Sequence, residues 1–223
     1  MGTMIQLTAA DGHKFSAYRA EPKGKPKGAL VVVMEIFGVN SHIKKVTDEY
    51  AADGYLAIAP AMFDRVQPGL DIGYTPADIE VGRGIMQKMK LDDALKDVQA
   101  AMKNVESAGK IGIVGYCWGG TVAWKSACNL NGLACSIPYY GGGIPGLINE
   151  KPKCPVMFQW GETDHSIPLD KAKEVAAAHK DQIHHFYPGA GHGFNCDQRG
   201  SYSAESSKLA RTRTLEFLAK HVG

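Results

Sequence analysis

The chain has 223 residues, of which 44% are hydrophobic and 22% charged, and its formal net charge is +2 at pH 7. This length predicts one domain, residues 1–223, with a sizeable core, and the near-neutral charge indicates neither a nucleic-acid nor a membrane partner. The five cysteines are scattered without a CxxC pair, which argues against a disulfide framework and against a structural zinc site. There is no signal-peptide pattern or membrane-spanning run, so we expect a cytoplasmic protein, and a monomer is favoured.

The predicted elements alternate between strands and helices along most of the chain. A hairpin is expected over residues 4–20, around Asp11-Gly12. Further strands are expected at residues 29–34, 55–59, 110–114, 133–140, 154–160 and 183–187, and helices at 41–53, from 76 onward, and at 91–105, 121–128, 169–179 and 204–221. Ser41 and Thr75 are the N-cap candidates for the first two helices. This alternation predicts an α/β fold with a mostly parallel sheet.

The stretch Gly115-Tyr116-Cys117-Trp118-Gly119-Gly120 joins a predicted strand to a predicted helix. Its form, Gly-x-Cys-x-Gly, is that of a nucleophile elbow with cysteine in place of the usual serine. Side chains two residues to either side of Cys117 would collide with the neighbouring strand and helix, which explains the glycines. The helix N-terminus favours a thiolate and a developing oxyanion. We therefore interpret Cys117 as a nucleophile rather than as a small buried cysteine in a glycine-rich turn.

Four predicted strands each end in a reactive side chain, and the carboxyl ends of parallel strands meet at one rim. These side chains are Glu35, Cys117, Asp164 and His192. The order nucleophile, acid, histidine is that of an α/β-hydrolase triad. His192 is predicted to take the thiol proton, and Asp164 to fix the imidazole tautomer. The backbone N–H groups of Trp118 and Ile36 are predicted to hold the oxyanion.

Other residues compete for these roles. Glu162 is an alternative to Asp164, whereas Asp170 opens a helix whose dipole its charge would offset. His165 adjoins Asp164 too closely to be its partner, and Glu35 has an alternative as a plain ion-pair residue. Structural positions are the simpler interpretation for Cys128, Cys135, Cys154, Cys196, His184 and His185.

Three segments together resemble the dienelactone hydrolases, also called carboxymethylenebutenolidases. They are Glu35-Ile36-Phe37-Gly38-Val39-Asn40, the elbow, and Ala190-Gly191-His192-Gly193-Phe194. The resemblance covers nearly the whole chain. It implies a single-domain α/β-hydrolase fold, with an eight-stranded, mostly parallel sheet flanked by helices on both faces. It also implies a small-molecule lactone or ester substrate and no cofactor.

The resemblance further implies a mechanism. Glu35 would hold the resting thiol of Cys117 neutral through a hydrogen bond, until substrate binding releases a thiolate beside His192. Cys117 would attack the lactone carbonyl and expel an enolate, and water activated by His192 would clear the acyl-enzyme. With the namesake substrate of the family, the product would be maleylacetate.

The substrate-binding positions depart from the pattern of the family. Two arginines hold the substrate carboxylate in well-studied members, and the matching positions here fall near Ile79 and at Cys196. Arg83 and Arg199 lie close by in the sequence and are the candidates to replace them, and Tyr139 matches the active-site tyrosine of the family. A broader carboxylesterase or thioesterase on the same triad is one alternative, and a non-catalytic protein with a reactive thiol is another.

Overall fold

An eight-stranded sheet runs through the computed structural model, which describes residues 1–223. Its strands are β1 (Thr3–Thr8), β2 (Lys14–Ala20), β3 (Gly28–Val33), β4 (Tyr55–Pro60), β5 (Ile111–Tyr116), β6 (Leu133–Tyr139), β7 (Met157–Gly161) and β8 (Ile183–Tyr187). Their spatial order is β1-β2-β4-β3-β5-β6-β7-β8. β1 and β2 form the antiparallel hairpin, β2 pairs antiparallel with β4, and all the other pairs are parallel. The predicted α/β fold with a mostly parallel sheet is therefore confirmed.

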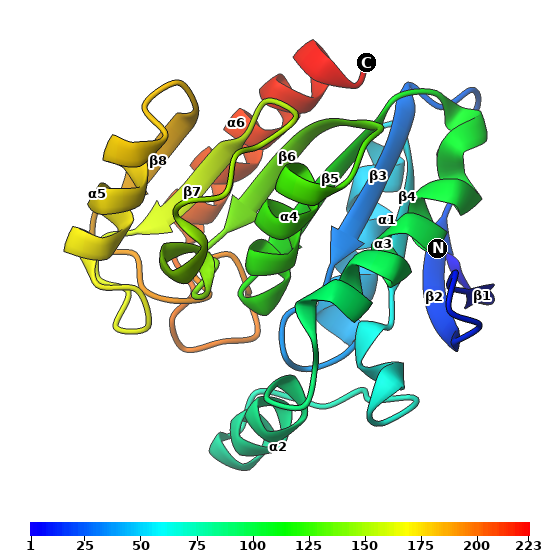
Figure 1. The fold of residues 1–223 in the computed structure, drawn as a ribbon, viewed down its shortest axis with the longest axis horizontal. Coiled ribbons are helices and arrows are strands. Elements are labelled where there is room, and N and C mark those ends of the chain that lie inside the picture. The colour runs from blue at the N-terminus through cyan, green and yellow to red at the C-terminus, as the bar shows by residue number, and fades with distance from the viewer.

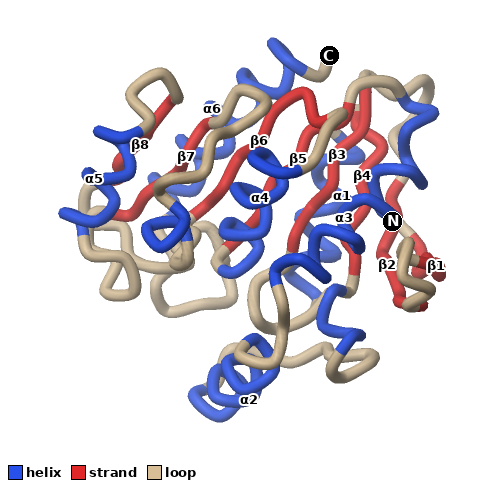
Figure 2. Tube along the Cα trace, viewed as in Figure 1, coloured by secondary structure: helices blue, strands red, loops and turns tan.

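Helices cover both faces of this sheet (Figures 1 and 2). They are α1 (Ser41–Ala52), α2 (Pro76–Met86), α3 (Leu91–Val105), α4 (Trp118–Asn129), α5 (Leu169–Ala178) and α6 (Ala204–His221). α3, α4 and α5 lie on the near face in Figure 1, and α1 and α6 lie behind the sheet. α2 lies beyond the end of the sheet toward which the parallel strands point. None of the helices combines the length and the apolar character that crossing a membrane requires.

The core explains the apolar runs in the sequence. β3, β4 and β5 are buried along their whole length, because helices cover both faces of the sheet there. The apolar stripe of α3 is packing surface, and Val98, Met102 and Val105 are all buried in it. Neither the central strands nor this stripe needs a function to account for its composition.

Two local details differ from the sequence expectation. Asn40, not Ser41, caps α1, since its side chain accepts a hydrogen bond from the Ile43 N–H at 3.2 Å. β7 begins at Met157 rather than at Cys154, because Pro155 has no N–H and the Val156 N–H donates to the Gln182 side chain at 2.8 Å, outside the ladder. Between β4 and α2 the chain also forms one short 3₁₀ helix, Met62–Arg65.

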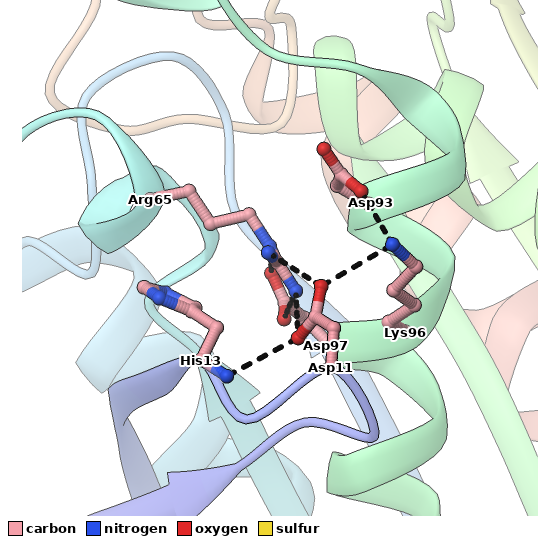
Figure 3. A network of polar contacts seen from close by, with 6 residues as sticks. All are labelled: Asp11, His13, Arg65, Asp93, Lys96 and Asp97. Carbon is pink, nitrogen blue, oxygen red and sulfur yellow. Dashed lines mark hydrogen bonds and ion pairs between the residues drawn. The ribbon is translucent and has the colours of Figure 1, made fainter.

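A charged network fastens the hairpin turn and the 3₁₀ helix to α3 (Figure 3). Arg65 donates to Asp97 through Nε at 2.8 Å and Nη2 at 2.7 Å, and to Asp11 through Nη1 at 3.0 Å. Lys96 binds Asp93 at 2.7 Å and Asp11 at 3.2 Å. Burial raises the pKa of Asp97, and the Arg65 guanidinium opposes that rise. Arg65 therefore compensates a fully buried carboxylate and anchors the loop that leads to α2.

Candidate active site

Cys117 occupies a strained turn between β5 and α4, and we call it the elbow cysteine. Its φ of 57° and ψ of −118° lie where a non-glycine residue costs on the order of 1–3 kcal/mol. A Cβ at Gly115 would lie within 3.0 Å of the Gly119 carbonyl, and one at Gly119 would collide in the same way with the Val33 carbonyl. The two glycines thus allow the strand and helix to approach, and the turn aims the sulfur beyond the end of the sheet.

The structure brings Cys117, His192 and Asp164 into one hydrogen-bonded line. His192 Nε2 lies 3.1 Å from Cys117 Sγ, and His192 Nδ1 lies 2.8 Å from Asp164 Oδ2. The other carboxylate oxygen of Asp164 accepts the N–H groups of Ser166 at 2.7 Å and Ile167 at 3.1 Å. These bonds fix the buried carboxylate, so that it orients the imidazole toward the sulfur.

The surroundings of His192 favour its charged form. Burial alone would lower its pKa, but the neighbouring Cys117 sulfur and the Asp164 carboxylate outweigh burial and raise the pKa to about 10. An imidazolium beside the sulfur, together with the positive end of the α4 dipole, stabilises a thiolate. The arrangement therefore places a proton donor beside the sulfur at neutral pH.

Two residues with unpaired backbone N–H groups line the same cavity. Trp118 is the first residue of α4, so its N–H has no partner within the helix. The Ile36 N–H donates to no other group of the protein, and both residues line the cavity beside Cys117. Behind Ile36, α2 packs Gly82 directly against the Ile36 carbonyl oxygen. The two donors are available for a developing oxyanion.

A cavity of about 520 Å³ opens in front of the elbow cysteine. α2 contributes Ile79, Arg83 and Met86 to its lining, and Arg199 also lines it. Arg83 makes no ion pair within the protein, so its guanidinium is free for a ligand. A largely apolar cavity with two cations is suited to a small organic anion.

Arg199 is held in place by Glu35. Its Nη1 donates to Glu35 Oε1 at 2.9 Å, and its guanidinium stacks over Phe37 at 5.6 Å. Successive turns after β8 bring Arg199 back toward the cavity, and its guanidinium lies where a Cβ of Gly193 would be. Arg199 thus reaches the site although it is out of register with the family pattern.

The expected hydrogen bond between Glu35 and the elbow cysteine is not formed. Glu35 is nearly inaccessible, and one of its oxygens is occupied by Arg199. The sulfur instead pairs with His192. The structure therefore shows Glu35 as the partner of a cavity cation, so any influence that it has on the thiol acts through its charge.

Tyr139 does not line the cavity, which corrects its expected role in substrate binding. Its ring is buried, and its hydroxyl pairs with Thr214 at 2.7 Å. Its carbonyl accepts the Cys117 N–H at 3.1 Å, so it supports the elbow. The next residue, Tyr140, has a φ of 36° and lies edge-on to His192 at 5.2 Å. The two tyrosines are adjacent in the sequence, and the sequence alone does not reveal which of the two rings faces the site.

The competing residues lie elsewhere. Asp164, not Glu162, pairs with His192, and Asp170 is exposed in the first turn of α5. The Nδ1 of His184 accepts the indole N–H of Trp160 at 3.2 Å. Burial raises the pKa of the Cys128 thiol to about 12 and that of Cys154 to about 11. The hydrogen bond of His184 and the raised thiol pKa values of Cys128 and Cys154 support structural positions for these three residues.

Comparisons with known proteins point in one direction. The sequence model of the dienelactone hydrolase family matches residues 15–222. A carboxymethylenebutenolidase of Pseudomonas putida is 30% identical over 96% of this chain and 95% of its own. A Synechocystis protein provisionally assigned the same activity is 36% identical over 87% of each chain. The crystal structure of a Klebsiella pneumoniae protein, provisionally assigned as a dienelactone hydrolase, has a TM-score of 0.83 and 28% identity, covering 98% of this chain and 99% of that one.

Proposed function

Since the chain belongs to the dienelactone hydrolase family and is a hydrolase acting on a lactone or ester, we propose that it opens enol-lactones of the carboxymethylenebutenolide type. The observation that carries this proposal is the line from Asp164 through His192 to Cys117, at a cavity that also holds two arginines. The 30% identity to a carboxymethylenebutenolidase supports the substrate class.

In the first half of the proposed reaction, the Cys117 thiolate attacks the lactone carbonyl carbon and a carbon–sulfur bond forms. The carbonyl oxygen becomes an oxyanion that accepts the N–H groups of Trp118 and Ile36. Collapse of this intermediate breaks the ring carbon–oxygen bond and expels an enolate. An enolate is a good leaving group, so the proton on His192 is sufficient acid assistance. The result is an acyl-enzyme joined through a thioester.

In the second half, neutral His192 takes a proton from water, and the resulting hydroxide attacks the thioester carbonyl. The carbon–sulfur bond breaks, the thiolate returns, and the acid product leaves. Asp164 holds the imidazole in one tautomer through both halves. With a dienelactone as substrate, the product would be maleylacetate.

The cavity arginines supply the proposed selectivity. Arg83 is unpaired and faces the space in front of the elbow cysteine, whereas Arg199 is already bonded to Glu35. A carboxylate on the substrate would meet both cations after the carbonyl has reached the sulfur. A charge-assisted contact of this kind contributes about 1.5–3 kcal/mol.

The experiment that tests this proposal compares a dienelactone with an uncharged aryl ester and a thioester. Arg83→Ala should lower kcat/KM for the charged lactone by roughly ten- to a hundred-fold, and should leave the aryl ester nearly unchanged. Arg199→Ala would also leave Glu35 unpaired, so a Glu35→Gln/Arg199→Ala double variant is the matched control. If all the variants treat charged and uncharged substrates alike, the arginines do not select a carboxylate and the protein is a broader esterase.

A further inference from the structure

Three potential metal ligands meet behind the active-site cavity. Glu35 follows β3, His42 lies in the first turn of α1, and Cys196 lies in the loop between β8 and α6. One ligand atom of each lies within 4.8 Å of the other two. Their exposures are 1%, 2% and 0%, so water does not solvate them. We call these residues the Glu35–His42–Cys196 cluster.

The cluster contains polar atoms that the protein does not satisfy. Glu35 Oε1 binds Arg199, but Oε2 has no hydrogen-bond partner, and neither ring nitrogen of His42 makes a hydrogen bond. A buried polar atom without a partner is costly. One cation would satisfy the free oxygen of Glu35, the imidazole of His42 and the thiol of Cys196 together.

We propose that Glu35, His42 and Cys196 bind a single divalent cation of the zinc type. Thiolate, imidazole and carboxylate are the ligands that zinc takes, at about 2.0–2.3 Å. Binding would replace the thiol proton of Cys196, which passes to solvent, by a sulfur–metal bond. Small side-chain movements would bring the three atoms to bonding distance from one centre.

The surroundings of His42 fit this role. Its Nδ1 lies 3.4 Å from Asp197 Oδ1, which leaves Nε2 for the cation. A carboxylate behind a metal-bound imidazole is the usual arrangement at zinc centres. A surface cavity of about 100 Å³, lined by both residues together with Asn195, offers a path from solvent.

The proposed cation would also affect the cavity. Glu35 would give Oε2 to the metal while Oε1 keeps Arg199. The Cys196 thiolate would offset one charge of the cation, and the Glu35 carboxylate would be shared between the cation and Arg199. The cation would therefore fix the Glu35 carboxylate, which positions Arg199, and would not itself contact the substrate.

The test must separate this cluster from the active-site Cys117 and His192, which also offer soft ligands. We would therefore titrate Co²⁺ and Zn²⁺ into the Cys117→Ala protein. Co²⁺ bound to a thiolate gives a charge-transfer band in the near ultraviolet, and calorimetry gives the zinc stoichiometry. We expect one equivalent of either metal and a thiolate–cobalt band.

Two variants in the same background assign the ligands. Cys196→Ser should abolish the band, and His42→Gln should weaken binding of both metals by at least about tenfold. Cys154→Ser is the matched control and should change neither, and circular dichroism checks that each variant is folded. If Cys196→Ser does not fold, His42→Gln decides alone. Absence of the band in the Cys117→Ala protein, its survival in Cys196→Ser, its loss in Cys154→Ser, or unchanged metal affinity in His42→Gln would each overturn the proposal.

Discussion

Replacing Gly82 with alanine is expected to slow hydrolysis, although Gly82 touches no reacting atom. α2 packs this glycine against the Ile36 carbonyl oxygen. A Cβ added at Gly82 would lie about 0.6 Å closer to that oxygen than 3.0 Å, the distance below which real Cβ contacts essentially do not occur. The opposing atom belongs to the backbone and cannot rotate away. Either α2 or the Ile36 segment must therefore shift, and we expect the shift to displace the Ile36 N–H that we propose as an oxyanion donor.

The size of the effect follows from the role of that donor. Losing one oxyanion donor costs about 10²–10³ in kcat, and a misplacement of about 1 Å can cost on the order of 100-fold. For a displacement of about 0.6 Å we expect kcat to fall by roughly ten- to a hundred-fold, or about 1.4–2.7 kcal/mol of transition-state stabilisation. Steady-state hydrolysis of an uncharged aryl ester measures this loss without involving the cavity arginines.

Gly84 provides the control on the same helix. A Cβ there meets nothing within 4 Å, and alanine is the better helix former by about 1 kcal/mol. Gly84→Ala should keep its activity and raise the melting temperature slightly. If the kcat of Gly82→Ala lies within about twofold of that of Gly84→Ala, the Ile36 segment is not held by this contact or does not contribute to the reaction.

Three other perturbations test the charges of the molecule. Glu35→Ala should speed alkylation of the elbow cysteine by iodoacetamide near neutral pH, because a negative charge that disfavours the thiolate is removed; a slower or unchanged rate across a pH series would argue against this effect. Arg65→Met should lower the free energy of unfolding in urea by about 3–5 kcal/mol, because it leaves a buried carboxylate uncompensated. The exposed Lys171→Ala should leave stability nearly unchanged, and equal losses in the two variants would contradict the structural role of the Arg65 network. The pKa of His192 is raised to about 10 in the folded protein, so its charge stabilises the fold below about pH 6.5, and this contribution disappears as the pH rises through 10. The melting-temperature gap between wild type and His192→Gln should therefore narrow from pH 7 to pH 10, and a constant gap would count against the raised pKa.

The elbow and the acid–histidine pair could be located from the sequence for physical reasons. The glycines around Cys117 are required by collisions within a few residues, so the local pattern is sufficient. Asp164 and His192 follow β7 and β8, and parallel strands deliver their carboxyl ends to one rim. Their meeting therefore follows from topology, without knowledge of side-chain conformations.

The substrate side of the site depended on details that the sequence does not carry. Arg199 reaches the cavity through successive turns in a loop, and Gly193 makes room for its guanidinium. The positive φ of Tyr140, rather than any pattern in the strand, decides that Tyr140 and not Tyr139 faces His192. A glycine such as Gly82 is a weak helix former, and only the packing of α2 reveals the close contact behind it.

The nucleophile is the central claim, and trapping the acyl-enzyme tests it most directly. The protein would be mixed with an aryl ester or a dienelactone, quenched in acid within the first turnover, digested, and analysed by mass spectrometry. We predict that the acyl mass appears on the peptide containing Cys117 before steady state is reached. The Cys117→Ala protein should show neither the adduct nor turnover. An adduct on any other residue, or hydrolysis by Cys117→Ala at a rate near that of the wild type, would contradict the proposed mechanism.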